Sequence, residues 1–596
     1  MVLSYYALLT LIMTYPLIRN FTTHFLGDGG DTYTYIWHFW YFKQQVLQWQ
    51  NPFFTDYIYF PIGASLFFTS YPLVNTMFAA LLLMATLDIV VIGNVLFLLA
   101  FILSGYCAFL LVDYLTQNKW AALLAGTVYA FCPYHMAHLL GHFDLILVHW
   151  LPLFVLFFLK MNRPEGTVRQ AVIAGSIAFL TAIDSAYYYA VFLIFFVGLF
   201  YLYQLRNRHS RREYADWRHV KKVLAMASTS LLLIAPIVAM AYQHARAGYY
   251  DKVEGWLGAN DFVSDVSAFF LPSHLHPYWQ PLVAWRYERF GSGVEGIVFI
   301  GWLVTLLTLI ACVYLARRQP ALRLWRFLFV AFVILSLGPT LHFNGKYVFV
   351  FDDLAISIPL PFFLVHFIPV LGHVRCPSRF AIMFMLCAAV LVGYTCSWLQ
   401  QKLGKRVRTF GLIYALTTMT ILIEYLSIPY PLCAARITTK AFQVLAQDKT
   451  PGTILEIPLV LCDGTASRGY RDAESFSTYT QITHNKKRIG GYISRGLNKP
   501  LNYIEQFPVI RNILDLEEGK AVPLEELDND RQSLPELIRK TALKYIVVYP
   551  GHHNTAYFDY VAKVFNLRGP IFQDEEGYFI RLCSAGPRRY RKHYRP

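Results

Sequence analysis

Two carboxylates stand close together near the start of the chain, in the segment Gly27-Asp28-Gly-Gly-Asp31, and the aromatic run from Tyr33 to Trp40 follows at once. A carboxylate in such a position can act as a general base towards a hydroxyl group. It can also help to hold a divalent cation, either Mg²⁺ or Mn²⁺. The alternative is structural, with Asp31 capping the N-terminus of a helix and Asp28 making a turn.

A second polar segment, residues 133–144, carries His135, His138, His142 and Asp144. Spacings of three and four place side chains on one helical face, so several imidazoles can lie next to a carboxylate. The alternative is a set of interfacial histidines that hydrogen-bond loop backbone, and a metal site is a further possibility. We expect His138, His142 and Asp144 to support a catalytic carboxylate.

Three further charged residues stand at the ends of apolar segments. A charge at a span boundary is costly unless it faces a cavity or a partner. Asp184 is therefore expected to line one chamber together with the carboxylates and histidines named above. Arg375 and Arg379 precede an apolar run, and arginine suits phosphate because its planar fork donates paired, charge-assisted hydrogen bonds. The alternative for these arginines is interfacial snorkelling.

The composition shows which kind of scaffold must position these groups. Of the 596 residues, 56% are hydrophobic and 15% are charged, whereas soluble proteins average about 45–50% and about 25%. The net charge of +15 is divided among short clusters between apolar runs, which is a topology signal and not a nucleic-acid-binding face. The nine cysteines form no CxxC pair that would indicate zinc.

A helix needs about 20 mostly apolar residues to cross a membrane, and on that basis the sequence predicts about eleven spans. They are expected at residues 2–20, 90–114, 119–134, 145–161, 169–184, 186–204, 222–242, 294–316, 326–342, 379–400 and 409–430. The apolar stretch from Leu73 to Leu87 is an extension of the second span, an interfacial helix or an additional crossing.

Basic residues decide the expected orientation, because Lys and Arg near span ends stay in the cytoplasm. Clusters within residues 160–169, 206–222, 317–326 and 402–408 fall on alternate connections and therefore share one side. This predicts a cytoplasmic N-terminus in a plasma (inner) membrane. The long loops 21–72, 243–293 and 343–378 then lie on the other side, where the positive-inside bias gives no reason for arginines and a phosphate partner is favoured.

The pattern changes after a membrane domain of residues 1–430. Short β-rich runs begin at Thr453 and Lys544, and a helical pattern over residues 528–541 precedes the second run. We therefore expect residues 431–596 to form an extracytoplasmic mixed α/β domain. One disulfide among Cys433, Cys462 and Cys583 is compatible with an oxidising compartment, and the basic tail 588–595 with contact to anionic lipid.

Several of these features together resemble the GT-C superfamily of membrane glycosyltransferases. They are the Gly27-Asp28-x-x-Asp31 segment, the phrase Asn51-Pro-Phe-Phe-Thr-Asp56 to Gly63, Gly141-His142-Phe-Asp144, Arg375-x-Pro-Ser-Arg379 and the C-terminal α/β domain. The chain is similar over most of its length to bacterial multi-span proteins of this type. It lacks the Asp-Glu pair of protein O-mannosyltransferases and the Trp-Trp-Asp motif of oligosaccharyltransferase.

The resemblance implies an enzyme that moves a sugar from a polyprenyl-phosphate or polyprenyl-diphosphate lipid to a glycan, lipid or protein acceptor on the non-cytoplasmic face. Asp31 or Asp28 would be the catalytic base, and Arg375 and Arg379 would hold the departing phosphate. The implied partners are the lipid-linked sugar, membrane lipids and the acceptor. No nucleic acid is expected.

Two other classes of protein remain open at this point. A transporter or lipid flippase also has many spans, although such proteins usually place their site near the midplane and contain inverted repeats. In this sequence the polar residues gather at the ends of the spans, and no repeat is visible. A scaffold protein would use only its C-terminal domain and would be indifferent to changes at Asp28 and Asp31.

Overall fold

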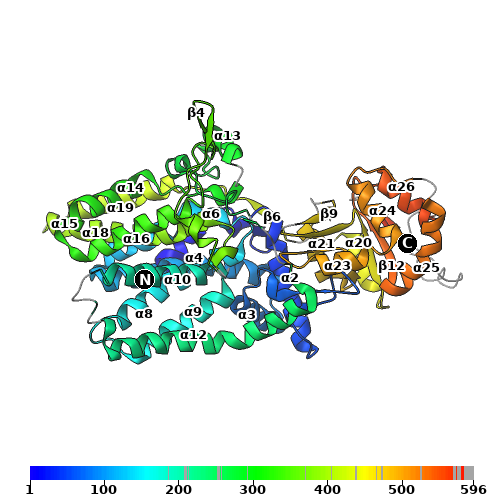
Figure 1. Ribbon diagram of the computed structural model, residues 1–596, viewed down its shortest axis with the longest axis horizontal. Helices are drawn as coiled ribbons and strands as arrows, with labels where there is room; N and C mark the ends of the chain where they lie inside the picture. Colours follow the sequence, from blue (N-terminus) through cyan, green and yellow to red (C-terminus); the bar gives the residue numbers. More distant parts are fainter. Residues whose placement is uncertain are drawn as a thin grey trace.

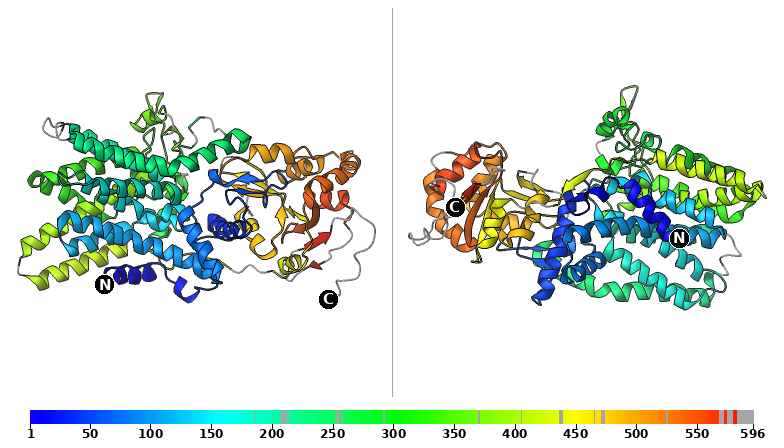
Figure 2. Two further views of the ribbon diagram at one scale, coloured as in Figure 1. Left: turned by 90° about the horizontal axis from the view of Figure 1, so that it is seen from below. Right: turned by 180° about the vertical axis from the view of Figure 1, so that it is seen from behind.

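The computed structural model has two parts, a bundle of long helices and a smaller α/β region beyond one end of the bundle (Figures 1 and 2). Helix α1 belongs to the bundle, and the chain from α20 (Lys440–Gln447) onward forms the α/β region. The structure describes the chain except for residues 186, 207–210, 212–213, 252–254, 257, 291–292, 369–370, 405, 436–438, 465, 471–473, 524–525, 568–571, 574–578 and 583–596. Cys583 and the basic tail 588–595 therefore lie outside the described residues.

An apolar helix lies in each of the segments where a span was predicted. The helices are α1 (Val2–Met13), α4 (Ile89–Thr116), α5 (Lys119–Ala130), α8 (Trp150–Met161), α9 (Val168–Asp184), α10 (Tyr187–Gln204), α12 (Trp217–His244), α14 (Trp302–Leu309), α16 (Pro320–Ser336), α18 (Ala381–Leu403) and α19 (Val407–Glu424). In the described part of the chain, six helical segments are long and apolar enough to cross a membrane: Ile89–Thr116, Phe143–Met161, Tyr187–Gln204, Trp217–Tyr249, Pro377–Leu403 and Val407–Glu424.

Burial separates a central helix from peripheral ones. Within the apolar window of α18, 94% of the residues are buried inside the protein, against 6% for α12 and 11% for α19. Helix α18 is therefore the core of the bundle, packed between α5 and α16. Few residues of α12 and α19 are fully buried, so both helices lie at the periphery of the bundle, which suits contact with lipid.

The structure narrows the three alternatives for the stretch from Leu73 to Leu87 and corrects two predicted boundaries. The stretch after Leu73 forms a separate helix, α3 (Leu73–Met84), whose 12 residues span only about 18 Å and cannot cross a hydrocarbon core of about 30 Å. The span predicted to begin at residue 294 begins at Trp302, because residues 297–301 are not helical and Gly301 adopts a positive φ of 96°. The span predicted to begin at residue 326 begins earlier, with Pro320 in its first turn, and ends at Ser336.

The longer connections gather at the end of the bundle nearest the α/β region (Figure 1). They contain β1 (His24–Leu26), α2 (Gly30–Leu47), β2 (Phe54–Thr55), β3 (Ala64–Ser65), α6 (Pro133–His138), α7 (Phe143–Ile146), α13 (Gln280–Phe290), β4 (Phe349–Phe351), β5 (Leu354–Ile356) and α17 (Phe362–Val365). Strand β1 pairs antiparallel with β6 (Leu432–Ala434), so the first connection is tied to the chain that leaves the last bundle helix.

The α/β region is built on a five-stranded sheet of order β10-β7-β12-β14-β13. Its strands are β10 (Lys487–Arg488), β7 (Thr453–Ile457), β12 (Leu543–Val548), β14 (Phe579–Leu582) and β13 (Phe572–Gln573). Strands β7 and β12 are the two predicted β-rich runs, and they pair in parallel. Helix α25 (Glu526–Thr541) precedes β12, as the sequence pattern indicated.

A second, three-stranded sheet of order β11-β8-β9 faces the bundle with β11 (Gly491–Ile493), β8 (Val460–Asp463) and β9 (Ser467–Gly469). The described helices of this region are α20 (Lys440–Gln447), α21 (Glu474–Tyr479), α22 (Gln481–His484), α23 (Asn498–Ile504), α24 (Pro508–Glu517), α25 and α26 (Ala556–Val564). Strand β11 lies against the first connection, where a Cβ on Gly491 would come within 2.7 Å of Ile58.

The first connection and the α/β region are joined by a backbone ladder. Arg488 N–H donates to the carbonyl of Tyr57 (2.9 Å), Phe60 N–H to that of Arg488 (3.0 Å), and Tyr59 N–H to that of Gly490 (3.2 Å). An ion pair between Asp56 and Lys487 stands beside this ladder. The segment from Asn51 to Gly63, one of the features of the resemblance, therefore docks the two parts of the molecule.

Candidate active site at the junction of the two parts

A cavity of about 500 Å³, the junction cavity, lies where the helical bundle meets the α/β region. It is lined by residues from the first connection, the α6–α8 segment, α9, α10, α12, the segment before α18 and the α/β region. Five of the residues singled out in the sequence line it: Asp31, His142, Asp144, Arg375 and Arg379. Groups that are more than 300 positions apart in the sequence therefore share one chamber.

Asp31 lies in the first turn of α2 and is partly buried. It does not cap the helix, because the N-cap position is Gly29, which has a φ of 97°. Burial raises the pKa of the Asp31 carboxyl, His142 counteracts this, and the Asp144 carboxylate raises the pKa further. A hydrogen bond with Tyr492 lowers it in part. A carboxylate with a raised pKa is a better proton acceptor, which suits a general base.

Asp28 has a different role. Its side chain is exposed and accepts a hydrogen bond from Gly30 N–H at 3.1 Å, so it makes the turn that the structural alternative predicted. Gly27, with a φ of 112°, packs so closely that a Cβ would come within 2.1 Å of the Leu140 carbonyl oxygen. Asp28 is not among the residues that line the cavity. The glycine-rich segment therefore directs Asp31, and not Asp28, towards the chamber.

The predicted histidine cluster is divided between two roles. Both ring nitrogens of His135 contact backbone carbonyl oxygens, those of Ala130 (2.6 Å) and Ile146 (2.9 Å), as the structural alternative expected. His138 and His142 instead face each other, with their Nδ1 atoms 3.3 Å apart. Asp144 is buried and accepts a hydrogen bond from the Tyr35 hydroxyl at 2.5 Å. His142 and Asp144 thus form the wall around Asp31.

Arg379 was expected to hold a phosphate, but the structure shows that it is not available for this. Its guanidinium is buried and bound to the carboxylate of Glu295, with Nε 3.0 Å from both carboxylate oxygens. Burial alone would raise the pKa of Glu295, but Arg379 and His138 outweigh it and lower that pKa to about 2. Since the positive charge of Arg379 is already neutralised, Arg379 supports the cavity wall and does not supply a free cation.

Asp184 also departs from the expectation. It is fully buried, and its oxygens accept hydrogen bonds from Asn75 N–H (2.9 Å), Asn75 Nδ2 (2.7 Å) and Trp150 Nε1 (3.1 Å). Its neighbours Ile183 and Ser185 line the cavity, but Asp184 does not. The carboxylate secures the start of α3 against α9, which is a structural role.

Arg375 remains open towards the chamber. Its Nη1 donates to the Gly464 carbonyl at 3.0 Å, and its guanidinium lies 5.6 Å from the centre of the Phe262 ring. Within the part of the chain that the structure describes, no carboxylate pairs with Arg375. An arginine with only a backbone and an aromatic partner can still bind an anion.

Sequence reasoning missed three functional candidates that the fold brings here. Glu295, the partner of Arg379, belongs to a short helical turn before α14. Tyr492 and Arg495 come from the α/β region and line the same cavity. The aromatic and polar groups of residues 481–495 predict a role in binding a sugar or glycan acceptor, and no spacing signal links this segment to the first connection.

A divalent cation was one expectation for the carboxylates. Over the described residues, no group of three or more His, Cys, Asp or Glu side chains converges in a way that could hold a metal ion. Of the two carboxylates in the wall, Asp144 accepts a hydrogen bond from the Tyr35 hydroxyl, and Asp31 forms a hydrogen bond with Tyr492. The described donor set therefore does not fit a metal ion.

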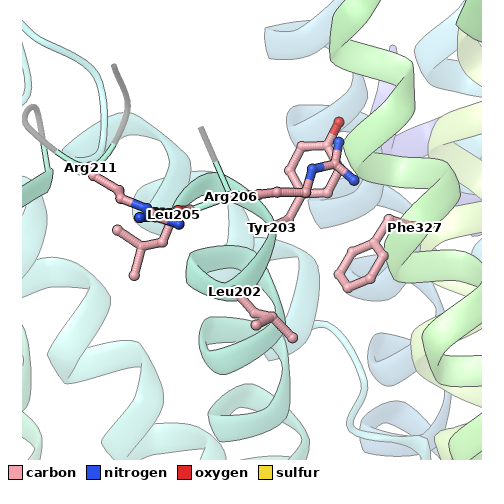
Figure 3. Close-up of a pocket in the computed structure, with 6 residues that line it drawn as sticks. All are labelled: Leu202, Tyr203, Leu205, Arg206, Arg211 and Phe327. Atoms are coloured by element: carbon pink, nitrogen blue, oxygen red, sulfur yellow. Dashed lines mark hydrogen bonds between the residues drawn. The ribbon is translucent and has the colours of Figure 1, made fainter. Parts of the chain in front are cut away.

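A second cavity, also of about 500 Å³, lies near the other end of α10 (Figure 3). Leu202, Tyr203, Leu205, Arg206, Arg211 and Phe327 line it. The rings of Tyr203 and Phe327 lie 5.5 Å apart, and Arg206 packs against Tyr203. No carboxylate lines this cavity. Of the two cavities, only the junction cavity brings acidic and basic side chains together among the described residues.

The sequence of residues 2–422 matches the model of the domain of unknown function DUF6311. The chain belongs to the DUF6311 family. No curated protein matches the chain. The match covers the helical bundle and its connections, so the membrane part of the junction cavity lies within the family domain.

Solved structures identify the fold. The arabinofuranosyltransferase AftD from Mycobacteria superposes with a TM-score of 0.58 at 11% identity, over 98% of this chain and 40% of that chain. This chain therefore spans about two fifths of the length of AftD. Two other similar structures are the Archaeoglobus fulgidus oligosaccharyltransferase in complex with Zn and sulfate (TM-score 0.49, 13% identity, 92% and 68% of the two chains) and ArnT from Cupriavidus metallidurans bound to undecaprenyl phosphate (0.45, 11%, 98% and 98%). The DUF6311 chain has the GT-C fold of membrane glycosyltransferases.

Proposed function

We propose that this DUF6311 protein is a membrane glycosyltransferase that moves a sugar from a polyprenyl-phosphate or polyprenyl-diphosphate lipid to an acceptor hydroxyl on the non-cytoplasmic face. The observation that carries the proposal is the junction cavity, whose wall contains both the partly buried Asp31 and Arg375. The fold shared with AftD, whose name denotes a sugar transferase, supports the same chemistry.

The walls of the cavity also suit a lipid donor. Ile234, Ile237 and Val238 of α12 line it, and only 6% of the residues in the apolar window of this helix are buried. Val238 is 54% exposed even though it lines the cavity. An isoprenoid chain can therefore lie along α12 in the membrane while its phosphate reaches the polar end of the chamber.

The proposed reaction is a direct displacement at the anomeric carbon. The acceptor oxygen forms the new bond to that carbon while its proton passes to a carboxylate oxygen of Asp31. The bond between the anomeric carbon and the phosphate oxygen breaks, and the lipid phosphate leaves with the electron pair. Arg375 stabilises the negative charge that develops on this phosphate. Asp144 and His142 tune and position Asp31.

The proposed membrane topology follows from the clusters of Lys and Arg on alternate connections between the helices. Arg317 and Arg318 lie in α15 (Ala316–Arg318), at the end of the bundle remote from the α/β region (Figure 1). We propose that this end is cytoplasmic, in a plasma membrane that about eleven helices cross. The junction cavity and the α/β domain of residues 431–596 are then extracytoplasmic.

The test is sugar transfer in liposomes from a panel of polyprenyl-phosphate and polyprenyl-diphosphate sugars, with and without Mg²⁺ or Mn²⁺, to glycan, lipid and peptide acceptors. Transfer from at least one donor by the wild-type protein supports the proposal. Movement of the lipid-linked sugar between leaflets without any transfer would favour the alternative, a lipid flippase or transporter. The assay therefore separates the two classes in one preparation.

A further inference from the structure

The loop around Gly464 in the α/β region holds two arginines from different parts of the chain. A Cβ placed on Gly464 would lie 2.8 Å from Nη1 of Arg495 and 3.9 Å from Nη1 of Arg375. Arg375 precedes the central helix of the bundle, whereas Arg495 follows β11 in the α/β region. Two guanidinium groups therefore converge on one point at the edge of the junction cavity, which both of them line.

The partners of these arginines leave their charges uncompensated. Arg375 Nη1 donates to the carbonyl of Gly464 at 3.0 Å, and Arg495 Nη1 donates to the carbonyl of Ser494 at 2.7 Å. Within the described ranges, neither guanidinium forms an ion pair with a carboxylate. Like charges held together repel each other, and this arrangement costs free energy unless an anion binds between them.

Arg379 shows what the same environment does with a structural arginine. That side chain is four residues from Arg375 and lines the same cavity, but Glu295 neutralises it. The contrast separates a cation that stabilises the wall from two cations that face the chamber.

The backbone holds Arg495 in place from both parts of the molecule. The Ser494 hydroxyl lies 3.1 Å from that of Thr69 in the first connection, and Gly464 N–H donates to the Ser494 carbonyl at 3.1 Å. Gly496, with a φ of 103°, approaches Tyr249 so closely that a Cβ would come within 2.4 Å of its carbonyl oxygen. Arg495 reaches the cavity only because the α/β region is docked against the connections.

We propose that Arg375 and Arg495 form a clamp for the phosphate of a polyprenyl-phosphate lipid, so that the donor site is complete only when the α/β region is docked. This inference rests on the proposed function and extends it. The two positive charges match the two negative charges of a polyprenyl monophosphate, the form in which a monophosphate-linked donor leaves. Because the ligand joins both parts, its binding and the docking of the α/β region stabilise each other.

The experiment measures binding of a polyprenyl monophosphate without a sugar, and of inorganic phosphate, to the full chain in nanodiscs. The variants are Arg375→Gln, Arg495→Gln, Arg495→Lys and the matched control Arg511→Gln, an exposed arginine of the same α/β region. Arg375→Gln and Arg495→Gln are each expected to weaken lipid binding about 10- to 100-fold. Arg495→Lys restores part of the affinity, and Arg511→Gln leaves it unchanged.

Hydrogen exchange on the same samples tests the coupling. The lipid is expected to slow exchange in residues 488–496 of the wild-type protein, and this protection disappears in Arg495→Gln. Binding of the lipid by Arg495→Gln at wild-type affinity would overturn the clamp. A variant that binds inorganic phosphate more weakly but the lipid as tightly as the wild type would overturn it too. Neither readout requires sugar transfer, so a failure of the proposed activity and a failure of the clamp are distinguished.

Discussion

The two cavities of this protein have similar volumes and lie near opposite ends of α10, but they differ in their polar groups. Tyr187 and Tyr188 of this helix line the junction cavity, and Leu202 and Tyr203 line the second one. Both cavities combine aromatic walls with arginines. The junction cavity adds a carboxylate with a raised pKa, a histidine and a second acid. Carboxylates therefore distinguish the candidate catalytic chamber, whereas arginines and aromatic rings line both cavities.

The largest effect on the integrity of the junction cavity is expected from breaking its buried ion pair. Glu295→Gln leaves the Arg379 guanidinium buried without a countercharge, and removing one partner of such a pair typically costs about 3–5 kcal/mol. We expect the denaturation midpoint in detergent to fall sharply. The double variant Glu295→Gln with Arg379→Met is expected to recover part of the loss. Equal stability of Glu295→Gln and wild type would contradict the role given to this pair.

A second prediction separates the two neighbouring arginines. Arg375→Gln is expected to reduce transfer about 10- to 100-fold with little change in thermal stability, because it removes charge-assisted hydrogen bonds to the donor phosphate and breaks no buried ion pair. Arg379→Gln should lower stability instead. Steady-state kinetics and thermal denaturation of both variants check the contrast. If the two variants behaved alike, the distinction between a free and a neutralised arginine would be lost.

The third prediction concerns pH. Because burial and the Asp144 carboxylate raise the pKa of Asp31 above its usual value of 3.8, the base loses activity at a higher pH than an ordinary aspartate would. We expect kcat/KM to fall as the pH decreases through this raised pKa, since protonated Asp31 cannot accept the proton. Asp144→Asn removes a neighbouring negative charge and shifts the midpoint to lower pH. A pH–rate profile of both proteins measures the shift, and an unchanged or higher midpoint would count against the assignment.

The smallest effect is expected at the second cavity. Arg206→Gln, at the end of α10 remote from the junction, should change transfer by less than about twofold, as surface substitutions away from a site usually do. The matched comparison is Arg375→Gln in the junction cavity, assayed with the same donor and at equal protein yield. A large loss of transfer in Arg206→Gln would show that the reaction depends on both cavities.

The sequence predicted the groups that lie close together along the chain. The Gly27-Asp28-x-x-Asp31 segment, His142 with Asp144, and Arg375 all belong to short motifs, and hydropathy located the helices that present them. The roles within each motif needed the fold. Spacing alone does not distinguish Arg375 from Arg379, because the partner that neutralises Arg379 is Glu295, 84 positions away.

Other errors arose from contacts between distant segments. Asp184 stands at a helix end, as a cavity residue would, but Asn75 and Trp150 occupy its oxygens. Arg495 and Tyr492 reach the cavity through the pairing of residues 57–60 with the strand before β11, a register that periodicity does not reveal. The start of α14 depended on Gly301, which has a positive φ of 96°, and the start of α16 on Pro320, which lies in its first turn.

The central claim is that Asp31 is the base in the junction cavity and that Asp28 only shapes the turn before it. The most direct measurement is the rate of sugar transfer by Asp31→Asn and Asp28→Asn proteins of equal yield and equal thermal stability. We predict that Asp31→Asn reduces the rate by about 10²- to 10⁴-fold, whereas Asp28→Asn retains most of it. Loss of transfer in Asp28→Asn with normal turnover in Asp31→Asn would contradict the account.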